Sequence, residues 1–379
     1  MGAQSTPDSR SGLGLGMFMM PLHPPTRSFG DTLRENAEKV LLADQLGFDE
    51  MWVGEHYSAS TEPIPAPMMF MAALLERTRR IKFATGVVNL PNHHPAIVAG
   101  EAAQFDHMSE GRFIFGIGPG GLASDFELFG NTDGDARGRR MMESIDMIQK
   151  IWASEPPYRI EGEFWNVTIE DAVIPELGVG YMRKPFQQPH PPIAMSAMSP
   201  FSGSVKTAAM KGWSPVSANF IPTYSVASHW KKYCEGCEEA GREPTGSDWR
   251  VARNIVIGES DADAEASAFS ETGSNHYYFS YLAEVLRRAD YMVAIKPDPN
   301  VPDDEVTTEA MMRDMVIHGS ADTVLDKLIA FREEVGPFGT LMMAAMDWSG
   351  PNREAEQRSM RLLAEKVMPR LRQHVGSLR

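Results

Sequence analysis

Residues 113–121 read FIFGIGPGG. The last six letters match G-x-G-x-x-G, the glycine fingerprint of dinucleotide-binding folds, and they follow an apolar run that predicts a strand. In that fingerprint a helix begins inside the glycine loop, so that its N-terminus meets a pyrophosphate. Here GPGGLASDFELFGNTDGD follows, which is typical of a loop, and a clear helical pattern begins only near Asp135. The stretch therefore favours a strand with a site-facing turn over a Rossmann site.

Short apolar strands alternate with longer amphipathic helices along most of the chain. Helices are expected at 29–47, with Asp31 as the N-cap and Gly47 as the stop, and also around 66–78 and at 95–111, 136–154, 224–241, 321–336 and 353–372. Strands are expected at 12–20, 48–54, 81–90, 112–118, 191–197, 212–218, 249–258 and 338–346. Eight strands in this rhythm predict an α/β fold, a (β/α)8 TIM barrel, rather than a doubly wound sheet.

Two stretches interrupt the rhythm and are expected to be insertions. Residues 155–190 are rich in proline and glycine and contain a hairpin-like piece, YRIEGEFWNV. Residues 275–315 are expected to be irregular. No linker divides the chain into two cores, so we expect one domain over 12–379, preceded by a disordered polar tail at 1–11.

Composition excludes several classes of function. The net charge is −15, from 51 acidic against 36 basic residues, and no basic stripe is present to bind nucleic acid. No apolar run approaches the length of a membrane span and no secretory signal is visible, so we expect a cytoplasmic protein that does not enter a membrane. Cys234 and Cys237 form C-x-x-C late in a helix without a second ligand pair, which indicates two reduced thiols rather than a zinc site.

The active site of a TIM barrel lies at the carboxyl ends of its strands. That rule selects His23 after the first strand, His56 and Tyr57 after the second, Asn89 after the third and Asp347 after the last. His56 is the best candidate for proton transfer, because imidazole titrates near neutral pH. The alternative is that His56 is simply a satisfied polar residue at a strand end.

The same strand ends offer candidate ligands for a phosphate or a metal. Residues 198–204, MSPFSGS, offer hydroxyl groups ahead of a helix, where a phosphate could bind or where Ser202 or Ser204 could simply cap the helix. No metal is expected at His56, His93 and His94, because the adjacent His93 and His94 point apart on an extended chain and no H-E-x-x-H motif or carboxylate pair stands at ligand spacing. Methionines near strand ends, Met343 among them, are either core filler or part of a hydrophobic pocket.

Several stretches together resemble the bacterial luciferase-like flavin monooxygenases, in particular the limonene and diketocamphane monooxygenase branches. They are GFDEMWVGEHYS (47–58), the run from IKFATGVVNL to FELFG (81–130), RMMESIDMIQKIW (140–152), EGEFWNV (161–167) and KPFQQPHPPIAMSAMS (184–199). The resemblance implies a TIM barrel and loosely held reduced FMN, supplied by a separate NAD(P)H:flavin reductase. It also implies O2 as co-substrate, added at the flavin C4a as a peroxide that oxygenates a hydrophobic organic substrate by Baeyer–Villiger reaction, epoxidation or hydroxylation. A homodimer is expected on the same ground.

The resemblance also assigns roles to residues. His56 matches the histidine that is expected to stabilise the oxygenated flavin and move a proton, while Tyr57 departs from the second histidine of many luciferases. Gly86-Val87 matches a bulge, often a non-proline cis peptide, against which the flavin ring rests. Asp125 matches an acid linked to flavin binding. Gly118 stands where the luciferases carry a reactive cysteine, which argues against a strict luciferase.

The remaining expected contacts divide between cofactor and substrate. Those for the flavin and its phosphate are Asn89, Ser196, Ala197, Met198, Ser199, Ser202 and Ser204. Those for the substrate pocket are His23, Tyr57, Met343 and Asp347. Two other functions stay open: a deazaflavin F420-dependent oxidoreductase of the same fold, and a flavin-binding protein that has lost turnover.

Overall fold

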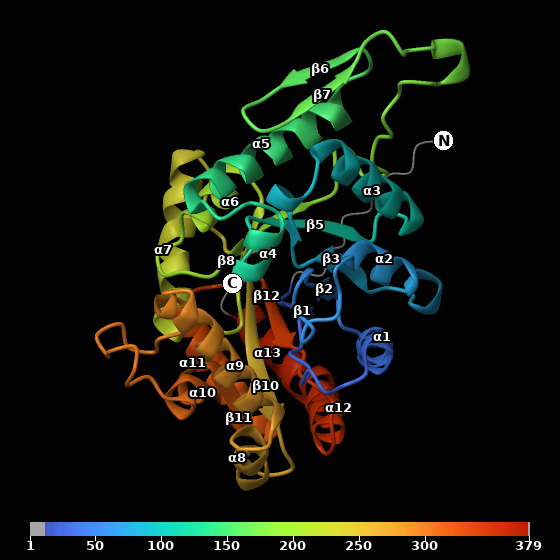
Figure 1. Ribbon diagram of the computed structural model, residues 1–379. Coiled ribbons are helices and arrows are strands. Elements are labelled where there is room, and N and C mark those ends of the chain that lie inside the picture. The colour runs from blue at the N-terminus through green and yellow to red at the C-terminus, as the bar shows by residue number, and fades with distance from the viewer. Residues whose placement is uncertain (1–11, 378–379) are drawn as a thin grey trace.

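The computed structural model describes residues 12–377, so the disordered tail expected at 1–11 lies outside it. Parallel strands close into a barrel in the order β12-β1-β2-β3-β5-β8-β9-β10, and β10 pairs with both β9 and β12 (Figure 1). These strands are β1 (Gly14–Met19), β2 (Glu50–Val53), β3 (Lys82–Thr85), β5 (Phe113–Gly118), β8 (Ile193–Ala197), β9 (Ser214–Ser217), β10 (Arg250–Ile257) and β12 (Thr340–Ala344). The prediction of a TIM barrel is confirmed.

Helices surround the barrel. They are α1 (Phe29–Leu46), α2 (Pro67–Ala72), α3 (Pro95–Met108), α4 (Ala123–Leu128), α5 (Gly134–Ala153), α6 (Gly203–Lys211), α7 (Thr223–Glu239), α8 (Asp261–Ala268), α9 (Ser274–Arg288), α10 (Thr308–Met315), α11 (Ala321–Val335), α12 (Asn352–Leu362) and α13 (Met368–Ser377). The C-cap of α1 is Gly47 with φ of 81°, as expected, because glycine adopts the left-handed conformation without a Cβ penalty. The N-cap prediction was wrong: Ser28 precedes α1, and Asp31 lies in its first turn.

The barrel interior explains one glycine of the opening stretch. Gly116 on β5 faces the buried indole of Trp52, and a Cβ placed on it would lie 1.9 Å from the carbonyl oxygen of Thr85. The Thr85 hydroxyl donates to the Gly116 carbonyl at 2.7 Å and accepts from the Gly116 amide at 2.9 Å. This glycine therefore allows two strands to approach closely, and no phosphate is needed to explain it.

The two insertions differ from each other. The first contains the expected antiparallel hairpin, β6 (Tyr158–Glu161) with β7 (Asn166–Ile169), which projects from the barrel together with the turn at Pro175–Leu177 (Figure 1). The second is not irregular as predicted, because α9 and α10 occupy most of it, with a short turn at Met292–Ala294 between them. The strand β11 (Val316–Gly319) was not anticipated, and it pairs with the end of β10.

Smaller departures complete the fold. The loop expected after residue 118 contains the single-turn helix α4, and the two-residue strand β4 (Val88–Asn89) pairs with β5. Both cysteines are free and lie on α7, Cys237 buried and Cys234 half-buried. Within residues 12–377 no helix has the length and apolarity that crossing a bilayer requires.

Candidate active site

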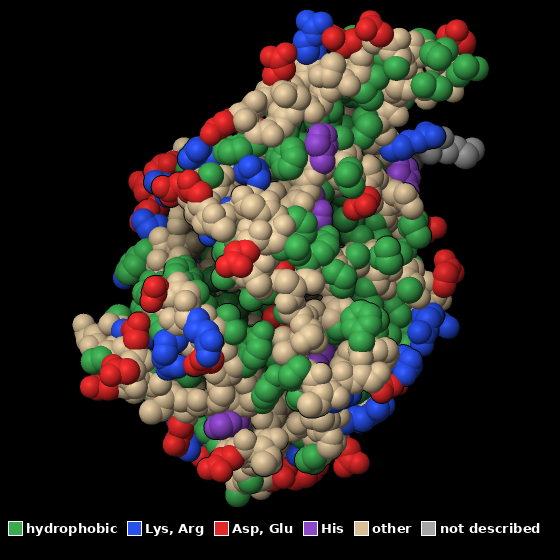
Figure 2. All heavy atoms as spheres, viewed as in Figure 1, with side chains coloured by type: hydrophobic (Ala, Val, Ile, Leu, Met, Phe, Trp, Pro, Cys, Tyr) green, Lys and Arg blue, Asp and Glu red, His purple; other side chains and the backbone are tan. Residues whose placement is uncertain are grey.

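A cavity of about 430 Å³ opens at the carboxyl ends of the barrel strands. Its walls come from the ends of β1, β2, β8 and β9, from the segments after β2, β3 and β5, and from α9. Figure 2 shows this face hollowed between α4 and α9, with hydrophobic side chains around the hollow. The apolar lining includes Phe18, Trp52, Phe126, Phe220, Leu282 and Leu286. A cavity of this size and polarity suits an organic ligand of cofactor size.

His56 lines the cavity directly after β2 and is held by Asp125 of α4. The Nδ1 atom of His56 lies 3.0 Å from Oδ2 of Asp125, which fixes the ring and places the proton on Nδ1 when Asp125 is ionised. Asp125 also accepts hydrogen bonds from the backbone amides of Tyr57 and Ser58 and from the Ser58 hydroxyl. Burial opposes ionisation of Asp125, but the hydrogen bonds from His56 and Ser58 keep its pKa below the ordinary value.

A second carboxyl group, Glu62, faces the other nitrogen of His56. Oε2 of Glu62 lies 3.3 Å from Nε2 of His56, and both side chains line the cavity. Burial disfavours the imidazolium, but attraction to Glu62 and the hydrogen bond with Asp125 raise the pKa of His56. Burial also raises the pKa of the Glu62 carboxyl, against the attraction of His56. The arrangement can therefore hold a proton at the cavity wall near neutral pH.

Several residues predicted to contact a flavin meet in this cavity. Gly86, Val87, Asn89, Ser196 and Met198 all line it, and the Gly86–Val87 peptide is cis, as the resemblance implied.

Gly118 and Ala197 lie behind this lining rather than in it. A Cβ on Gly118 would lie 2.6 Å from Cγ2 of Val87 and 2.9 Å from the Ser196 hydroxyl oxygen. A cysteine side chain there would press on both residues, so glycine at position 118 sets the shape of this wall.

Arg137 of α5 was not predicted, although it is the only lysine or arginine among the described residues that line the cavity. Its guanidinium carbon lies 3.6 Å from the ring centre of Phe126, and Nη1 donates to the carbonyl oxygen of Asn131 at 2.7 Å. Burial lowers the pKa of Arg137, which stays far above neutral because arginine begins so high. The cavity therefore has one fixed positive charge.

The serines expected to bind phosphate lie elsewhere. Ser202 is the N-cap residue of α6 without a side-chain capping bond, and the Ser199 carbonyl lies 2.9 Å from Nε2 of His229. Neither these two nor Ser204 is among the residues that line the cavity. The phosphate contacts expected at Ser199, Ser202 and Ser204 therefore lie outside this lining and stay a prediction.

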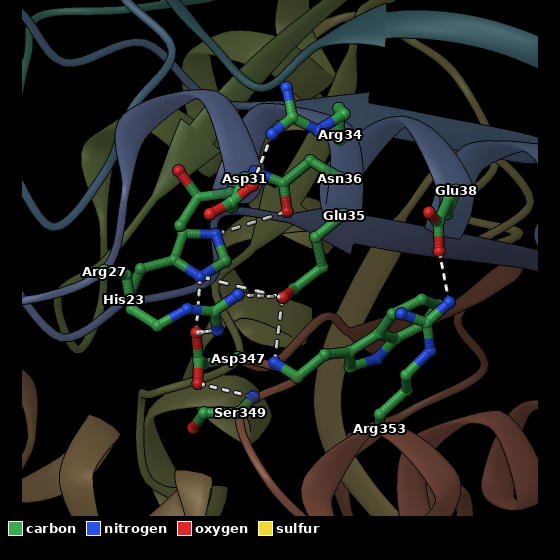
Figure 3. Close-up of polar contacts among 12 residues, drawn as sticks. His23, Arg27, Asp31, Arg34, Glu35, Asn36, Glu38, Asp347, Ser349 and Arg353 are labelled. Carbon is green, nitrogen blue, oxygen red and sulfur yellow. Dashed lines mark hydrogen bonds and ion pairs between the residues drawn. The ribbon is translucent and has the colours of Figure 1, made fainter.

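The four residues expected in the substrate pocket do not line this cavity either. Tyr57 is exposed and packs edge-on against Phe129, and Met343 borders a separate cavity of about 30 Å³. His23 and Asp347 are buried together, with Nδ1 of His23 2.6 Å from Oδ1 of Asp347 (Figure 3).

His23 and Asp347 form a buried charge cluster with Arg27, Glu35 and Lys39, called here the His23 cluster (Figure 3). Arg27 lies 2.6 Å from Asp347 and 2.7 Å from Glu35, and Lys39 lies 2.7 Å from Glu35. His23, Glu35 and Asp347 are close enough to one another to suggest metal ligands. The positive charges of Arg27 and Lys39 balance the negative charges of Glu35 and Asp347. Ion pairing therefore accounts for the arrangement of these side chains.

Comparison with known proteins decides the family. The sequence profile described as luciferase-like monooxygenase matches residues 14–337. The chain belongs to the luciferase-like monooxygenase family. The resemblance inferred from the sequence is thereby confirmed, and so is the prediction of an enzyme of the flavin-dependent monooxygenase class.

Relatives within the luciferase-like monooxygenases match over nearly the whole chain. The 4-hydroxyprotoasukamycin monooxygenase of Streptomyces nodosus subsp. asukaensis is 32% identical over 94% of this chain and 92% of its own. The limonene 1,2-monooxygenase of Rhodococcus erythropolis is 28% identical over 95% and 87%. Among solved structures, the oxygenating constituent of 3,6-diketocamphane monooxygenase of Pseudomonas putida, in complex with FMN, has a TM-score of 0.84 at 28% identity, covering 94% of this chain and 98% of that one.

Sequence reasoning missed three parts of the cavity wall. Glu62 lies beyond the strand end, in a segment that carries no motif. Arg137 lies in an amphipathic pattern that predicts a helix packed on the barrel and does not mark any residue as facing the cavity. Helix α9 carried a usable signal, because Tyr281, Leu282, Val285 and Leu286, with the C-cap residue Ala289, recur with helical spacing and all line the cavity.

Proposed function

We propose that this protein is the oxygenating component of a two-component monooxygenase that uses reduced FMN and O2 to oxygenate a small hydrophobic organic substrate. The observation that carries the proposal is the large apolar cavity with a carboxylate-held histidine, His56, at its wall. Relatives that match over nearly the whole chain are named as monooxygenases. An F420-dependent glucose-6-phosphate dehydrogenase of Amycolatopsis mediterranei matches less well, at 26% identity over 80% of this chain.

The residues of the cavity fit FMN in shape and charge. The Gly86–Val87 segment and the indole of Trp52 offer apolar walls to a flat ring system. Gly120 and Gly121 expose backbone to the cavity, and Arg137 offers the positive charge that a phosphate requires. Reduced flavin, when bound, supplies two electrons and the activation of O2.

The protein's own groups then have defined tasks. His56 holds a proton at the cavity wall, and Asp125 keeps the imidazole oriented. The apolar residues of α9 exclude water, which would otherwise break down a reactive oxygen species. The same apolar surface favours a hydrophobic substrate such as a terpenoid, a ketone or a polyketide.

Partner and assembly follow as further parts of the proposal. A separate NAD(P)H:flavin reductase would deliver reduced FMN, since the trigonelline monooxygenase relative of Acinetobacter baylyi is named as an oxygenase component. We propose a homodimer in the cytoplasm, with the chain from residue 12 onward acting as one domain. Support for the dimer comes from exposed apolar side chains on the adjacent helices α2 and α3, namely Met69, Ile97 and Met108.

The test supplies the purified protein with FMN, NADH, O2 and a generic flavin reductase, and offers limonene and a diketocamphane as probe substrates. We expect oxygenated product, no product without reductase, and loss of coupled product formation in His56→Ala. A parallel titration compares reduced FMN with reduced F420. Binding of F420 without binding of reduced FMN would overturn the proposal, and binding of oxidised flavin without turnover on any substrate would indicate an inactive flavin-binding protein.

A further inference from the structure

His56 faces a carboxyl group at each ring nitrogen, and the two carboxyl groups are used differently. Asp125 accepts hydrogen bonds from His56, Tyr57 and Ser58, so its oxygens are fully occupied. Oε2 of Glu62 is buried and makes no hydrogen bond to any residue of the described chain, although it lies 3.3 Å from Nε2 of His56. Buried polar atoms without a hydrogen bond are rare, and functional sites are one place where they gather.

Glu62 belongs to the cavity, whereas Asp125 stands behind it. Glu62 and His56 both line the cavity, and Asp125 is not among the lining residues. The segment that carries Glu62 is fastened on both sides, because the His56 amide donates to the Ile64 carbonyl at 3.2 Å and the Thr61 hydroxyl donates to Tyr281 of α9 at 3.0 Å. Glu62 is thus held against the imidazole and open to whatever the cavity binds.

The charged surroundings of Glu62 favour a carboxyl group that can exchange a proton. The titratable groups that face it are His56 and His23, which attract its negative charge, and Asp125, which repels it. The phenols of Tyr278 and Tyr281 face it from α9. His56 in turn faces Glu62, Asp125 and Glu55. One labile proton between Glu62 and His56 fits this balance, because Asp125 supplies the fixed negative charge.

We propose that Glu62 shares a proton with Nε2 of His56 and that this pair, rather than His56 alone, passes the proton to the reacting oxygen in the cavity. The proposal rests on the proposed function. In the overall reaction, reduced flavin, O2 and substrate give oxidised flavin, oxygenated substrate and water. The two hydrogens of the water come from the reduced flavin, so the pair gives up one proton, takes one back and is unchanged after each turnover.

The first test follows His56 in the protein without cofactor. Glu62→Gln keeps the size of the side chain but removes its charge and its exchangeable acid proton. Titration by NMR of histidine-labelled protein, with His56 assigned by its loss in His56→Ala, should show a lower pKa for His56 in Glu62→Gln. Glu127→Gln, an exposed change on α4, is the matched control and should leave the His56 titration unchanged. An unchanged His56 titration in Glu62→Gln would overturn the proposal.

The second test measures hydrogen peroxide released when chemically reduced FMN, O2 and the protein are mixed without substrate, across neutral pH. We expect the midpoint of the pH profile to move to lower pH in Glu62→Gln and the rate at neutral pH to fall about 10-fold or more. Glu62→Asp, which keeps an acid, should retain part of the rate. Superimposable profiles for wild type and Glu62→Gln, with normal binding of reduced FMN, refute proton sharing alone. Failure of the wild type to bind reduced FMN would refute the proposed function instead.

Discussion

Alanine substitutions at three glycines distinguish effects on the stability of the fold from effects on the cavity wall. In Gly116→Ala the new Cβ would lie 1.9 Å from a backbone oxygen, that of Thr85, so β3 and β5 must part. Two hydrogen bonds with Thr85 are then lost or stretched, at about 1 kcal/mol each, and overpacking adds about 1–3 kcal/mol. We expect the free energy of unfolding to fall by about 3–5 kcal/mol. The affinity for FMN should fall only to the extent that the protein unfolds.

Gly118→Ala meets side chains instead of backbone, at 2.6 Å from Val87 and 2.9 Å from Ser196, which can shift. We expect a loss of about 1–3 kcal/mol in stability and, because both neighbours line the cavity, FMN binding about 10-fold weaker. Gly138→Ala, in α5 with no atom within 4 Å of the new Cβ, is the control and should stabilise by about 0.5–1 kcal/mol. Urea denaturation and FMN fluorescence titration measure the two effects. The reasoning is wrong if Gly116→Ala costs no more stability than Gly118→Ala, or if Gly118→Ala binds FMN as the wild type does.

Three further substitutions test the charged groups. Asp125→Asn keeps an oxygen that can accept from His56 but removes the negative charge that raises the pKa of His56, so the alkaline limb of the activity profile should move to lower pH. Activity should fall about 100-fold, and an unmoved limb contradicts the pairing. Arg137→Gln should weaken the binding of FMN at least about 10-fold and leave the binding of riboflavin, which lacks the phosphate, unchanged. Equal losses of affinity for both would exclude a phosphate contact. Burial opposes ionisation of Asp347, but hydrogen bonds from His23 and Ser349 lower its pKa to about 2. The contribution of ionised Asp347 to the free energy of unfolding is therefore present above the unfolded-state pKa and is lost as pH falls toward about 2. In urea denaturation at neutral pH, Asp347→Asn should lower the free energy of unfolding by about 2 kcal/mol, and this acid dependence should disappear. A cost that is the same at pH 7 and in acid would show that packing dominates.

The barrel was predictable because its signal is local. Each barrel strand is a short apolar run, and the carboxyl-end rule then found His56 without any knowledge of its partners. The same rule also selected His23 and Asp347, which follow strand ends. Their side chains bind each other within the His23 cluster and do not line the cavity. Position along the chain says that a side chain lies near the end of the barrel, and the available partners decide whether it faces the cavity.

The rest of the site depends on contacts between distant segments. Asp125 reaches His56 because α4 folds back over the segment after β2, a contact between residues 69 apart in the chain. Glu62 and Arg137 enter the cavity from segments whose local patterns indicate loop and helix packing respectively. No spacing within either segment encodes that meeting, so the sequence alone could not supply it.

The contacts of Asp125 have a consequence for enzyme engineering. Its carboxylate binds the backbone amides of Tyr57 and Ser58, and the loop after β2 and the helix α4 are therefore fastened to each other as one module. A chimera that takes either segment alone from a relative would break this junction even if every cavity-lining side chain were matched. Exchange of substrate range between members of the family should therefore move residues 54–66 and 119–133 together.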